Sequence, residues 1–447
     1  GEAVSNFLSD DFLHDLKNGY DKIFLLTINK KNIHLYTEKL SLIDDVHEIK
    51  QVKRHFISKF IEGFSDLIHN ISIGTQSSKI RVQIKIAQST TFLSYFKNLM
   101  ILNLAKIFVL LKLQNLIYFL NSYINFKFSS TFVDDYINKI NPTVVFNSSH
   151  VHNVSVLPYL YSIKKKRIPI IGFIFSWDNI TSQGRIFPDH DYLLSWNNET
   201  VDLIRKYYGN KYANKTKIIG TPQFDHYFKE FYSKDLSREE FCSLYKLDPN
   251  KKIILYSTGM SWHMPKEPVI VKRILESLDL NFKENDRPQL LLRVYAKDNP
   301  AIYHPLYGVN NLFIQDPKWN IEFKQPSLEA KYILKQTLLH VDLGINIAST
   351  LTLELLMFNK RVLNIAFTPS EKSLDEIDKK LSDNEKKHFT AKQLKNSEFR
   401  SVEKFYDYEH YRDITHNSSV LKCYDEKKLA KFIAMGLNYE INQKEKK

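Results

Sequence analysis

Cysteine is nearly absent from this sequence. The 2 cysteines among 447 residues, Cys242 and Cys423, lie far apart and match no metal-ligand spacing, which argues against a cysteine-based metal site. Free thiols fit a reducing cytoplasm, and no secretory signal peptide is recognisable. We therefore expect a cytoplasmic protein. Glycine is also scarce, at 12 residues, but in a chain rich in Asn, Lys and Ile this reflects compositional bias and supports no structural conclusion.

Long uncharged apolar runs are missing as well. The most apolar stretch, residues 96–120, is interrupted by Lys106, Lys112 and several amide side chains. It therefore contains no run of about 18 uncharged apolar residues of the kind that crosses a bilayer. Two interpretations remain: a pair of buried helices, or a helix on a membrane surface supported by the nearby lysines.

Acidic residues are outnumbered by basic ones. With 50 Asp and Glu against 63 Lys and Arg, the formal charge is +13, which suits nucleic acid, an anionic membrane surface or a phosphorylated substrate. The basic residues are dispersed, however, and the tightest interior run is residues 164–167. No nucleic-acid motif with interleaved aromatic residues stands out, so we expect no nucleic-acid partner.

The chain is long enough for two domains with separate cores, since 43% of its 447 residues are hydrophobic. Short apolar runs alternate with helical patterns, which is typical of α/β proteins with parallel sheets. Residues 38–67 are expected to be helical, whereas residues 79–87 alternate like a strand or a half-exposed helix. The main expected strands are 21–28, 143–149, 168–176, 191–196, 216–221, 251–259, 288–295, 311–316, 340–349 and 360–367.

A domain boundary is expected at residues 220–228, where Gly and Pro punctuate the chain. We assign an N-terminal domain to residues 1–222, a C-terminal domain to residues 223–424, and a terminal helix to residues 425–447. The N-terminal domain is one possible packing partner for that helix. Gly1 leads at once into a helical pattern, so a natural first strand is expected to precede it.

Ligands of open parallel sheets gather at the C-terminal ends of the strands. In the second half, the strand at 252–257 is followed by Thr258, Gly259 and Met260, where glycine allows close approach of the backbone to a ligand. A plain turn is an equal alternative. The next strand ends in Arg293, which suits a phosphate held by the guanidinium group. A structural ion pair explains this arginine nearly as well.

The clearest signal is the stretch "LGINIASTLTLELL", residues 343–356. Ser349 and Thr350 stand where a buried strand ends and a helix begins, so free backbone N–H groups and two hydroxyls would favour an anion. Glu354 is placed to face the same opening, where a carboxylate can accept both ribose hydroxyls. The alternative is that one hydroxyl caps the helix and Glu354 offsets the helix dipole.

The first half offers different groups at its strand ends. His150 and His152 follow the strand at 143–149 and are candidate general bases, although non-catalytic histidines are commoner. Trp177, Asp178 and Asn179 follow the most apolar strand of this half. Asp178 could deprotonate a hydroxyl, and Trp177 could stack on the face of a sugar.

Taken together, these segments resemble the GT-B glycosyltransferases, above all those of bacterial capsule, lipopolysaccharide and teichoic-acid synthesis. UDP-N-acetylglucosamine 2-epimerases and CDP-glycerol glycerophosphotransferases have related folds. The resemblance rests on "SWDNITSQG", "LLSWNNETVDLIRKYYG", "IIGTPQFD", "SREEFCSLYKLDPNKKIILYSTG" and "LLHVDLGINIASTLTLELLMFNKRVLNIAF", which lie between about residue 170 and residue 367.

The resemblance implies an α/β fold of two Rossmann-like parallel-sheet domains facing a cleft. The C-terminal domain would hold the donor, with the diphosphate at Ser349 and Thr350, the ribose at Glu354, and Arg293 and the Thr258–Gly259 turn completing the site. The N-terminal domain would hold the acceptor near Trp177 and Asn179 and supply the base. No metal or other cofactor is expected, because helix dipoles and basic side chains take the charge of the leaving group.

Three departures from the family patterns stand out, and the first two restrict the activity. The epimerases carry a glycine-rich turn with several acids where this chain has "ASTLTLE", and the glycerophosphotransferases typically lack a Glu at position 354. Arg293 is followed by Val-Tyr, where the family often shows His-Pro.

We therefore predict a glycosyltransferase of bacterial surface polysaccharide synthesis, peripheral at the inner face of the membrane. It would move a sugar from a nucleotide-sugar to a glycan or lipid-linked acceptor. The alternatives are a glycerophosphotransferase or epimerase on the same fold, or a non-catalytic member that binds glycan or partner enzymes.

Overall fold

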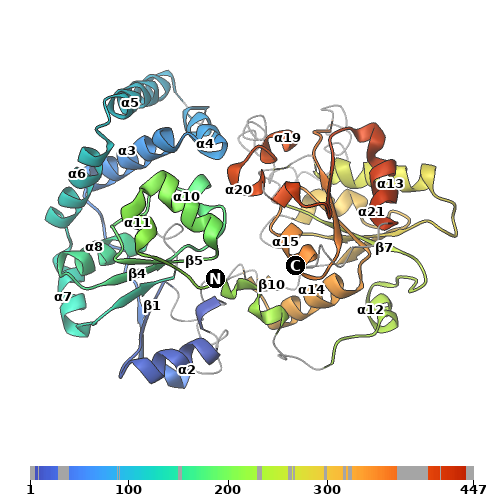
Figure 1. Ribbon diagram of the computed structural model, residues 1–447, viewed down its shortest axis with the longest axis horizontal. Coiled ribbons are helices and arrows are strands. Elements are labelled where there is room, and N and C mark those ends of the chain that lie inside the picture. The colour runs from blue at the N-terminus through green and yellow to red at the C-terminus, as the bar shows by residue number, and fades with distance from the viewer. Residues whose placement is uncertain are drawn as a thin grey trace. The chain divides into compact units, whose positions relative to one another are not determined.

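The chain forms two compact units, Gly1–Asp225 and His226–Lys447 (Figure 1). The boundary predicted from the sequence, after residue 222, lies a few residues earlier. The computed structural model describes residues 6–8, 10–28, 40–87, 89, 91–148, 154–228, 234–259, 264, 267–295, 300–315, 319–320, 325–369, 401–412 and 414–438.

Unit 1 contains a four-stranded sheet in which every pairing is parallel, in the order β3-β4-β5-β6. These strands are short apolar runs, as predicted, and they are joined by helices, which parallel neighbours require. A separate parallel pair is made by β1 (Phe24–Thr27) and β2 (Asp45–Glu48). The bounds of the four strands are Val145–Asn147, Ile170–Phe173, Tyr192–Ser195 and Thr216–Ile218.

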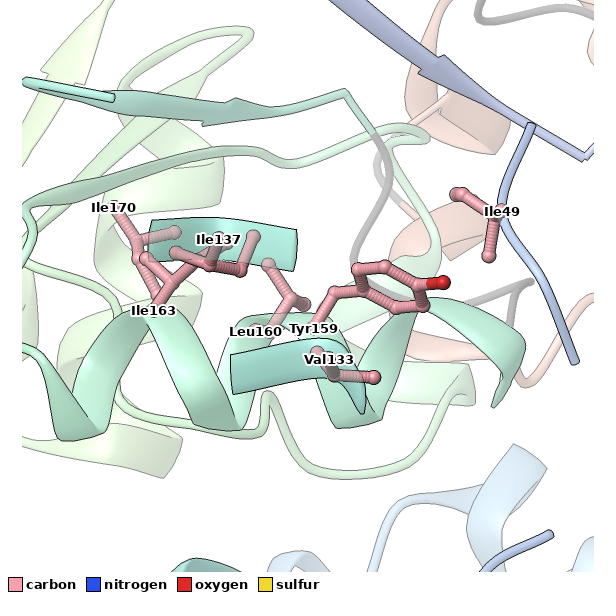
Figure 2. Packing of buried hydrophobic residues seen from close by; sticks show 7 residues of the cluster. All are labelled: Ile49, Val133, Ile137, Tyr159, Leu160, Ile163 and Ile170. Carbon is pink, nitrogen blue, oxygen red and sulfur yellow. The ribbon is translucent and has the colours of Figure 1, made fainter. Parts of the chain in front are cut away.

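Two core clusters hold helices against this sheet. Figure 2 shows the first, in which α7 (Thr131–Ile140) and α8 (Leu157–Lys165) pack with Ile170 of β4. In the second, α10 (Asn198–Tyr208) and α11 (Asn210–Asn214) pack with Leu193 of β5. The remaining short elements of the unit are α2 (Asp10–Gly19), η2 (Leu40–Leu42), η3 (Val154–Val156), α9 (Asn179–Ser182) and η4 (Pro222–Tyr227), the last of which ends in unit 2.

A group of four helices forms its own core beside the sheet of unit 1 (Figure 1). The helix expected over 38–67 is wrong in its first part, because β2 lies there and α3 starts only at Phe56. Residues 79–87 are helical, since Ile80 and Ile84, one turn apart, are both buried. The helices are α3 (Phe56–Ile73), α4 (Gln76–Ala87), α5 (Phe92–Leu110) and α6 (Gln114–Lys127).

The helix α5 is buried on one side only, so the expectation of a buried helix in this segment holds in part. Within the described residues it is the one helix long and apolar enough to cross a membrane, and 11% of its most apolar window is buried. Leu102 and Ala105 pack in the core of the four-helix group, whereas Phe92 and Leu110 are 85% and 80% exposed.

Unit 2 contains a six-stranded parallel sheet in the order β14-β13-β12-β7-β8-β9. The central strands are buried on both faces, which explains their unbroken apolar sequences. The predicted α/β class with parallel sheets is therefore confirmed in both units. The strands are β7 (Ile253–Ser257), β8 (Gln289–Arg293), β9 (Leu312–Gln315), β12 (Leu343–Asn346), β13 (Arg361–Ile365) and β14 (Val420–Cys423), with a small antiparallel pair β10 (Trp319–Asn320) and β11 (Gln325–Pro326).

The predicted terminal helix belongs to unit 2. This helix, α21 (Leu429–Leu437), packs on α13, β13 and β14, and Gly436 lies so close to β12 that a Cβ there would come 2.7 Å from Leu343. The other helices of the unit are α12 (Arg238–Tyr245), α13 (Glu267–Asn281), η5 (Pro300–Leu306), α14 (Leu328–His340), α15 (Leu351–Met357), α19 (Val402–Phe405), α20 (Glu409–Arg412), η6 (Ile414–His416) and η7 (Glu426–Lys428).

Candidate functional site

The sheet of unit 2 changes direction between β7 and β12. From β7 the chain continues outward to β8 and β9, whereas β12, β13 and β14 follow one another outward on the other side. In open α/β sheets the crevice beyond the carboxyl ends of the two strands at such a switch point is where ligands bind. The segments that follow these two strands, 258–259 and 347–350, are the ones that the sequence singled out.

The turn from β12 into α15 is tight and internally bonded. Ala348 has a φ of +34°, a conformation that costs energy in an alanine and that often occurs at functional sites. Its N–H donates to the hydroxyl of Tyr406 at 3.3 Å. The N–H of Leu351 donates to Ser349 Oγ at 3.2 Å, and the N–H of Thr352 donates to the carbonyl of Ser349 at 3.0 Å.

These bonds correct one sequence-based expectation. The backbone amides at the start of α15 were expected to be free for an anion, but those of Ala348, Leu351 and Thr352 already have acceptors within the protein. Ser349 acts as a capping residue, which is the alternative that the sequence left open. The hydroxyl of Thr350 makes no capping hydrogen bond and remains a candidate ligand group.

A buried polar network fixes the position of α15. Asn346, Thr352 and Asn364 are all 0% exposed. Thr352 Oγ1 lies 3.1 Å from Asn346 Oδ1 and 2.8 Å from the hydroxyl of Tyr411. Asn364 Nδ2 donates to Asn346 Oδ1 at 2.9 Å, and the hydroxyl of Tyr411 donates to Asn364 Oδ1 at 3.1 Å. Asn346 Nδ2 has no hydrogen-bond partner within the described residues, but the other bonds link α15 to β12 and β13 and favour one arrangement of these elements.

Close packing brings α15 directly against β12. A Cβ on Gly344 would lie 2.2 Å from Cδ1 of Leu355, a distance that no real contact reaches. Glycine is therefore required for the helix to approach the strand this closely. Glu354 is the residue before Leu355 in the helix, so this contact also fixes the position of Glu354 relative to β12.

Glu354, Arg293 and Tyr227 lie together in unit 2. The buried hydroxyl of Tyr227 donates a hydrogen bond to Glu354 Oε2. Burial raises the pKa of Glu354 above its ordinary value, while the bond from Tyr227 and the positive charge of Arg293 act in the opposite direction. Burial and the neighbouring Glu354 raise the pKa of Tyr227 well above its usual value, so Tyr227 remains a donor. Arg293 also donates to Ser257 Oγ at 3.4 Å.

The turn after β7 is occupied by an internal carboxylate. Glu267 is 0% exposed, and each of its oxygens accepts from the N–H of Gly259 at 2.9 Å. It also accepts from the hydroxyls of Tyr256 and Tyr303, each at 3.1 Å. The backbone N–H of Gly259 is thus used within the protein. Thr258 is buried and its Oγ1 accepts from the N–H of Tyr295 at 2.8 Å, while Met260 lies outside the described residues.

In unit 1, Trp177 and Asp178 form the turn that leads from β4 to α9. Asp178 is half-buried, and its carboxylate accepts from Ser182 Oγ at 2.6 Å and from Asn179 Nδ2 at 3.3 Å. Asn179 is 2% exposed and its Oδ1 accepts from the N–H of Ser176 at 3.0 Å. Asn179 therefore holds the turn together, whereas Asp178 and Trp177 are half-buried and can meet solvent.

The histidines proposed as bases, His150 and His152, lie outside the described residues. The histidine that the structure places at the end of β3 is His190. Its Nδ1 lies 2.7 Å from the carbonyl of Pro188, and its Nε2 lies 3.0 Å from Asn147 Nδ2. Both ring nitrogens are used, and burial lowers the pKa of His190 to about 4. His190 is a neutral structural residue.

Two residues of unit 2 that touch the predicted positions were not found from the sequence. Tyr227 is 127 positions from Glu354, and Glu267 lies at the start of a helix with no motif around it. The only sequence feature that relates Glu267 to the turn is its position eight residues after Gly259, and this spacing matches no known pattern. Among the described residues, no group of three or more His, Cys, Asp or Glu side chains could hold a metal ion.

No protein-family model matches the sequence, and a search of curated protein sequences finds no match. Solved structures resemble the fold. The UDP-GlcNAc 2-epimerase of Methanocaldococcus jannaschii is 14% identical over 72% of this chain and 76% of its own, with a TM-score of 0.41. MurG of Acinetobacter baumannii is 12% identical over 68% of this chain and 69% of its own, with a TM-score of 0.32. The wall teichoic acid polymerase TagF is 14% identical over 69% of this chain and 83% of its own, with a TM-score of 0.31. At these values the likeness concerns architecture and bears on no activity.

Proposed function

We propose that the chain is a glycosyltransferase that takes a sugar from a nucleotide-sugar donor. The observation that carries this proposal is the position of Glu354, Arg293 and Thr350 around the β7/β12 switch point of unit 2. An acid, a cation and a hydroxyl at such a crevice suit the ribose and diphosphate of a nucleotide. The acceptor would be a glycan or a lipid-linked sugar of a bacterial surface polysaccharide such as a capsule or lipopolysaccharide.

The donor would be held mainly by side chains. Glu354 would accept hydrogen bonds from the ribose hydroxyls, and Arg293 and Thr350 would bind the diphosphate. Because the amides of Gly259 and Leu351 are already bonded within the protein, backbone groups would contribute less than in a glycine-rich phosphate loop. Tyr227 would keep Glu354 oriented, and a ribose hydroxyl would share or replace its hydrogen bond.

The acceptor side of the reaction is assigned to unit 1. Asp178 would take the proton of the acceptor hydroxyl, and the acceptor oxygen would form a bond to C1 of the donor sugar. The bond from C1 to the phosphate oxygen would break, and the nucleoside diphosphate would leave with the electron pair, its charge met by Arg293. His150 and His152 are the alternative bases. Trp177 would stack on the sugar, and no metal is assigned a role.

The internal bonding of Glu354 and Gly259 supports one competing function, a non-catalytic member of the fold. In that case these bonds only stabilise unit 2, and nucleotide binding is absent. A glycerophosphotransferase or an epimerase is the other alternative.

Consumption of the donor separates these possibilities. The chain would be incubated with UDP-, GDP- and ADP-sugars and with CDP-glycerol, and release of the nucleotide would be measured with a mixture of glycan and lipid-linked acceptors. Acceptor-dependent release from one nucleotide-sugar, lost in Asp178→Asn and kept in Asp202→Asn on the exposed side of α10, supports the proposal. Release from CDP-glycerol alone, interconversion of the donor sugar without an acceptor, or no turnover of any donor would each contradict it.

A further inference from the structure

The helix α5 exposes a continuous apolar face to solvent. With 3.6 residues per turn, the exposed residues of this face fall within an arc of roughly 120°. Asn103 is the polar residue within that arc. The α5 apolar face consists of Phe92, Leu93, Phe96, Met100, Leu104, Ile107, Leu110 and, just beyond the helix, Leu111, which are 46% to 85% exposed.

The opposite side of the same helix is already packed. Leu102 and Ala105 are buried in the core cluster that α5 shares with α3 and α6. A helix that is apolar on all sides is normally buried on all sides. The described part of the chain covers only one side of α5. The other side is an exposed apolar surface, and such surfaces often mark interaction sites.

A second apolar stripe lies on the neighbouring helix α6. Leu116, Phe119 and Tyr123 follow one another at helical spacing and are 49%, 66% and 54% exposed. The rings of Phe119 and Tyr123 stack at 6.4 Å. Exposed apolar residues therefore occur on both of these consecutive helices, α5 and α6.

The segment of chain that carries this surface has charges of one sign. Residues 67–133 contain no Asp or Glu, and they carry seven basic residues, Lys79, Arg81, Lys85, Lys97, Lys106, Lys112 and Lys127. Lys97 and Lys106 are exposed and flank the α5 apolar face on its two sides, roughly 20° and 40° outside the arc. Lysines in this position extend their ammonium groups to anionic headgroups while their stems lie along apolar surface.

We infer that the α5 apolar face binds the surface of an anionic membrane. The helix would lie in the headgroup region and would not cross the bilayer, because Leu102 and Ala105 are held in the protein core. A second copy of the chain is a poorer partner. A twofold contact would bring this face against itself, with Lys97 and Lys106 facing like charges and no acid in the segment to offset them.

This inference assigns a contact surface to the peripheral location that the sequence analysis predicted. It is independent of the nucleotide site, because lipid binding is measured without nucleotide or acceptor. Failure of one proposal therefore leaves the other standing. The test uses the full chain in flotation with vesicles of phosphatidylcholine alone and of an about 2:1 mixture with phosphatidylglycerol.

The expected result is flotation with the anionic vesicles and little with the neutral ones. Phe96→Ser, Met100→Ser and Ile107→Ser combined should weaken binding about a thousandfold, since each removes roughly tenfold in affinity. Lys97→Gln and Lys106→Gln should each cost roughly fivefold. Leu280→Ser is the control, because Leu280 is 84% exposed on α13 of unit 2 and should not affect flotation.

Three results would overturn the inference. One is that the wild-type chain stays in the soluble fraction with both vesicles. Another is that the triple variant floats as well as the wild type. The third is that sedimentation shows a dimer that the triple substitution converts to monomer, which would assign the α5 apolar face to a second copy.

Discussion

The hydroxyl of Tyr227 donates a hydrogen bond to the carboxylate of Glu354, across 127 positions of the chain. The bond gives this acid a defined orientation at the switch point of the unit 2 sheet. Burial at the same time raises the pKa of Glu354, so the carboxylate keeps its proton to a higher pH than an exposed glutamate would.

This shift predicts the pH dependence of nucleotide binding. The ionised carboxylate is a stronger acceptor for the two ribose hydroxyls than the protonated acid, so the affinity should rise with pH as Glu354 loses its proton above the ordinary glutamate range. In Glu354→Gln that rise should disappear, leaving only the titration of the nucleotide itself. Calorimetric titrations between pH 5 and 8 would measure it, with Glu276→Gln, an acid of α13, as the control. Equal profiles for the wild type and Glu354→Gln would contradict the role given to Glu354.

Gly344 should not tolerate a side chain. A Cβ there would meet Leu355, which is 0% exposed, at 2.2 Å, so Gly344→Ala should lower the free energy of unfolding by about 1–3 kcal/mol. Gly63→Ala is the matched control, because Gly63 lies within α3 with no atom near its missing Cβ. That substitution should raise the stability by roughly 0.5–1 kcal/mol. Urea denaturation would measure the free energy of unfolding of both variants. If Gly344→Ala leaves it unchanged, α15 does not pack against β12 as described.

Glu267 should be among the most sensitive positions of unit 2. Its removal in Glu267→Ala leaves the N–H of Gly259 and the hydroxyls of Tyr256 and Tyr303 without their acceptor. We expect a loss of roughly 3 kcal/mol in the free energy of unfolding. Glu276→Ala, on the same helix but in an exposed pair with Arg273, should change it by less than about 1 kcal/mol. Similar losses for the two variants would show that the network around Glu267 contributes little.

The sequence allowed much of unit 2 to be predicted. The apolar runs at 252–257, 289–293 and 360–367 are strands because central strands of a parallel sheet are buried on both faces. The alternating sequence at 79–87 is a helix that packs against α3, α5 and α9, with Ile80 and Ile84 buried. Such tertiary partners are not visible in the local sequence. For the same reason the sequence showed Glu354 but not Tyr227, which only the fold brings to it.

Unit 1 contains a histidine that should make folding sensitive to acid. Burial, together with the positive charges of Arg185 and Arg81, lowers the pKa of His69 to about 3. As the pH falls, His69 therefore takes up a proton in the unfolded chain at a higher pH than in the folded chain. The free energy of unfolding is thus highest above about pH 6.5 and decreases as the pH falls toward 3. His69→Phe keeps the ring beside Tyr208 without a titrating group, and the fall of stability below pH 6.5 should become shallower. Denaturation curves at several pH values would measure this, and an unchanged slope would rule out His69 as its source.

The central claim is that unit 2 binds a nucleotide at the β7/β12 switch point. The most direct measurement is a thermal-shift titration with UDP, GDP, CDP, CMP and ADP, carried out on the wild type, Thr350→Ala, Glu354→Gln and the control Glu276→Gln. A ligand at a hundred times its Kd stabilises the native state by about 2.7 kcal/mol. The account predicts a shift with one nucleoside diphosphate that persists in Glu276→Gln, is smaller in Thr350→Ala and is lost in Glu354→Gln. No shift with any nucleotide, or a shift of the same size in Glu354→Gln, would contradict it.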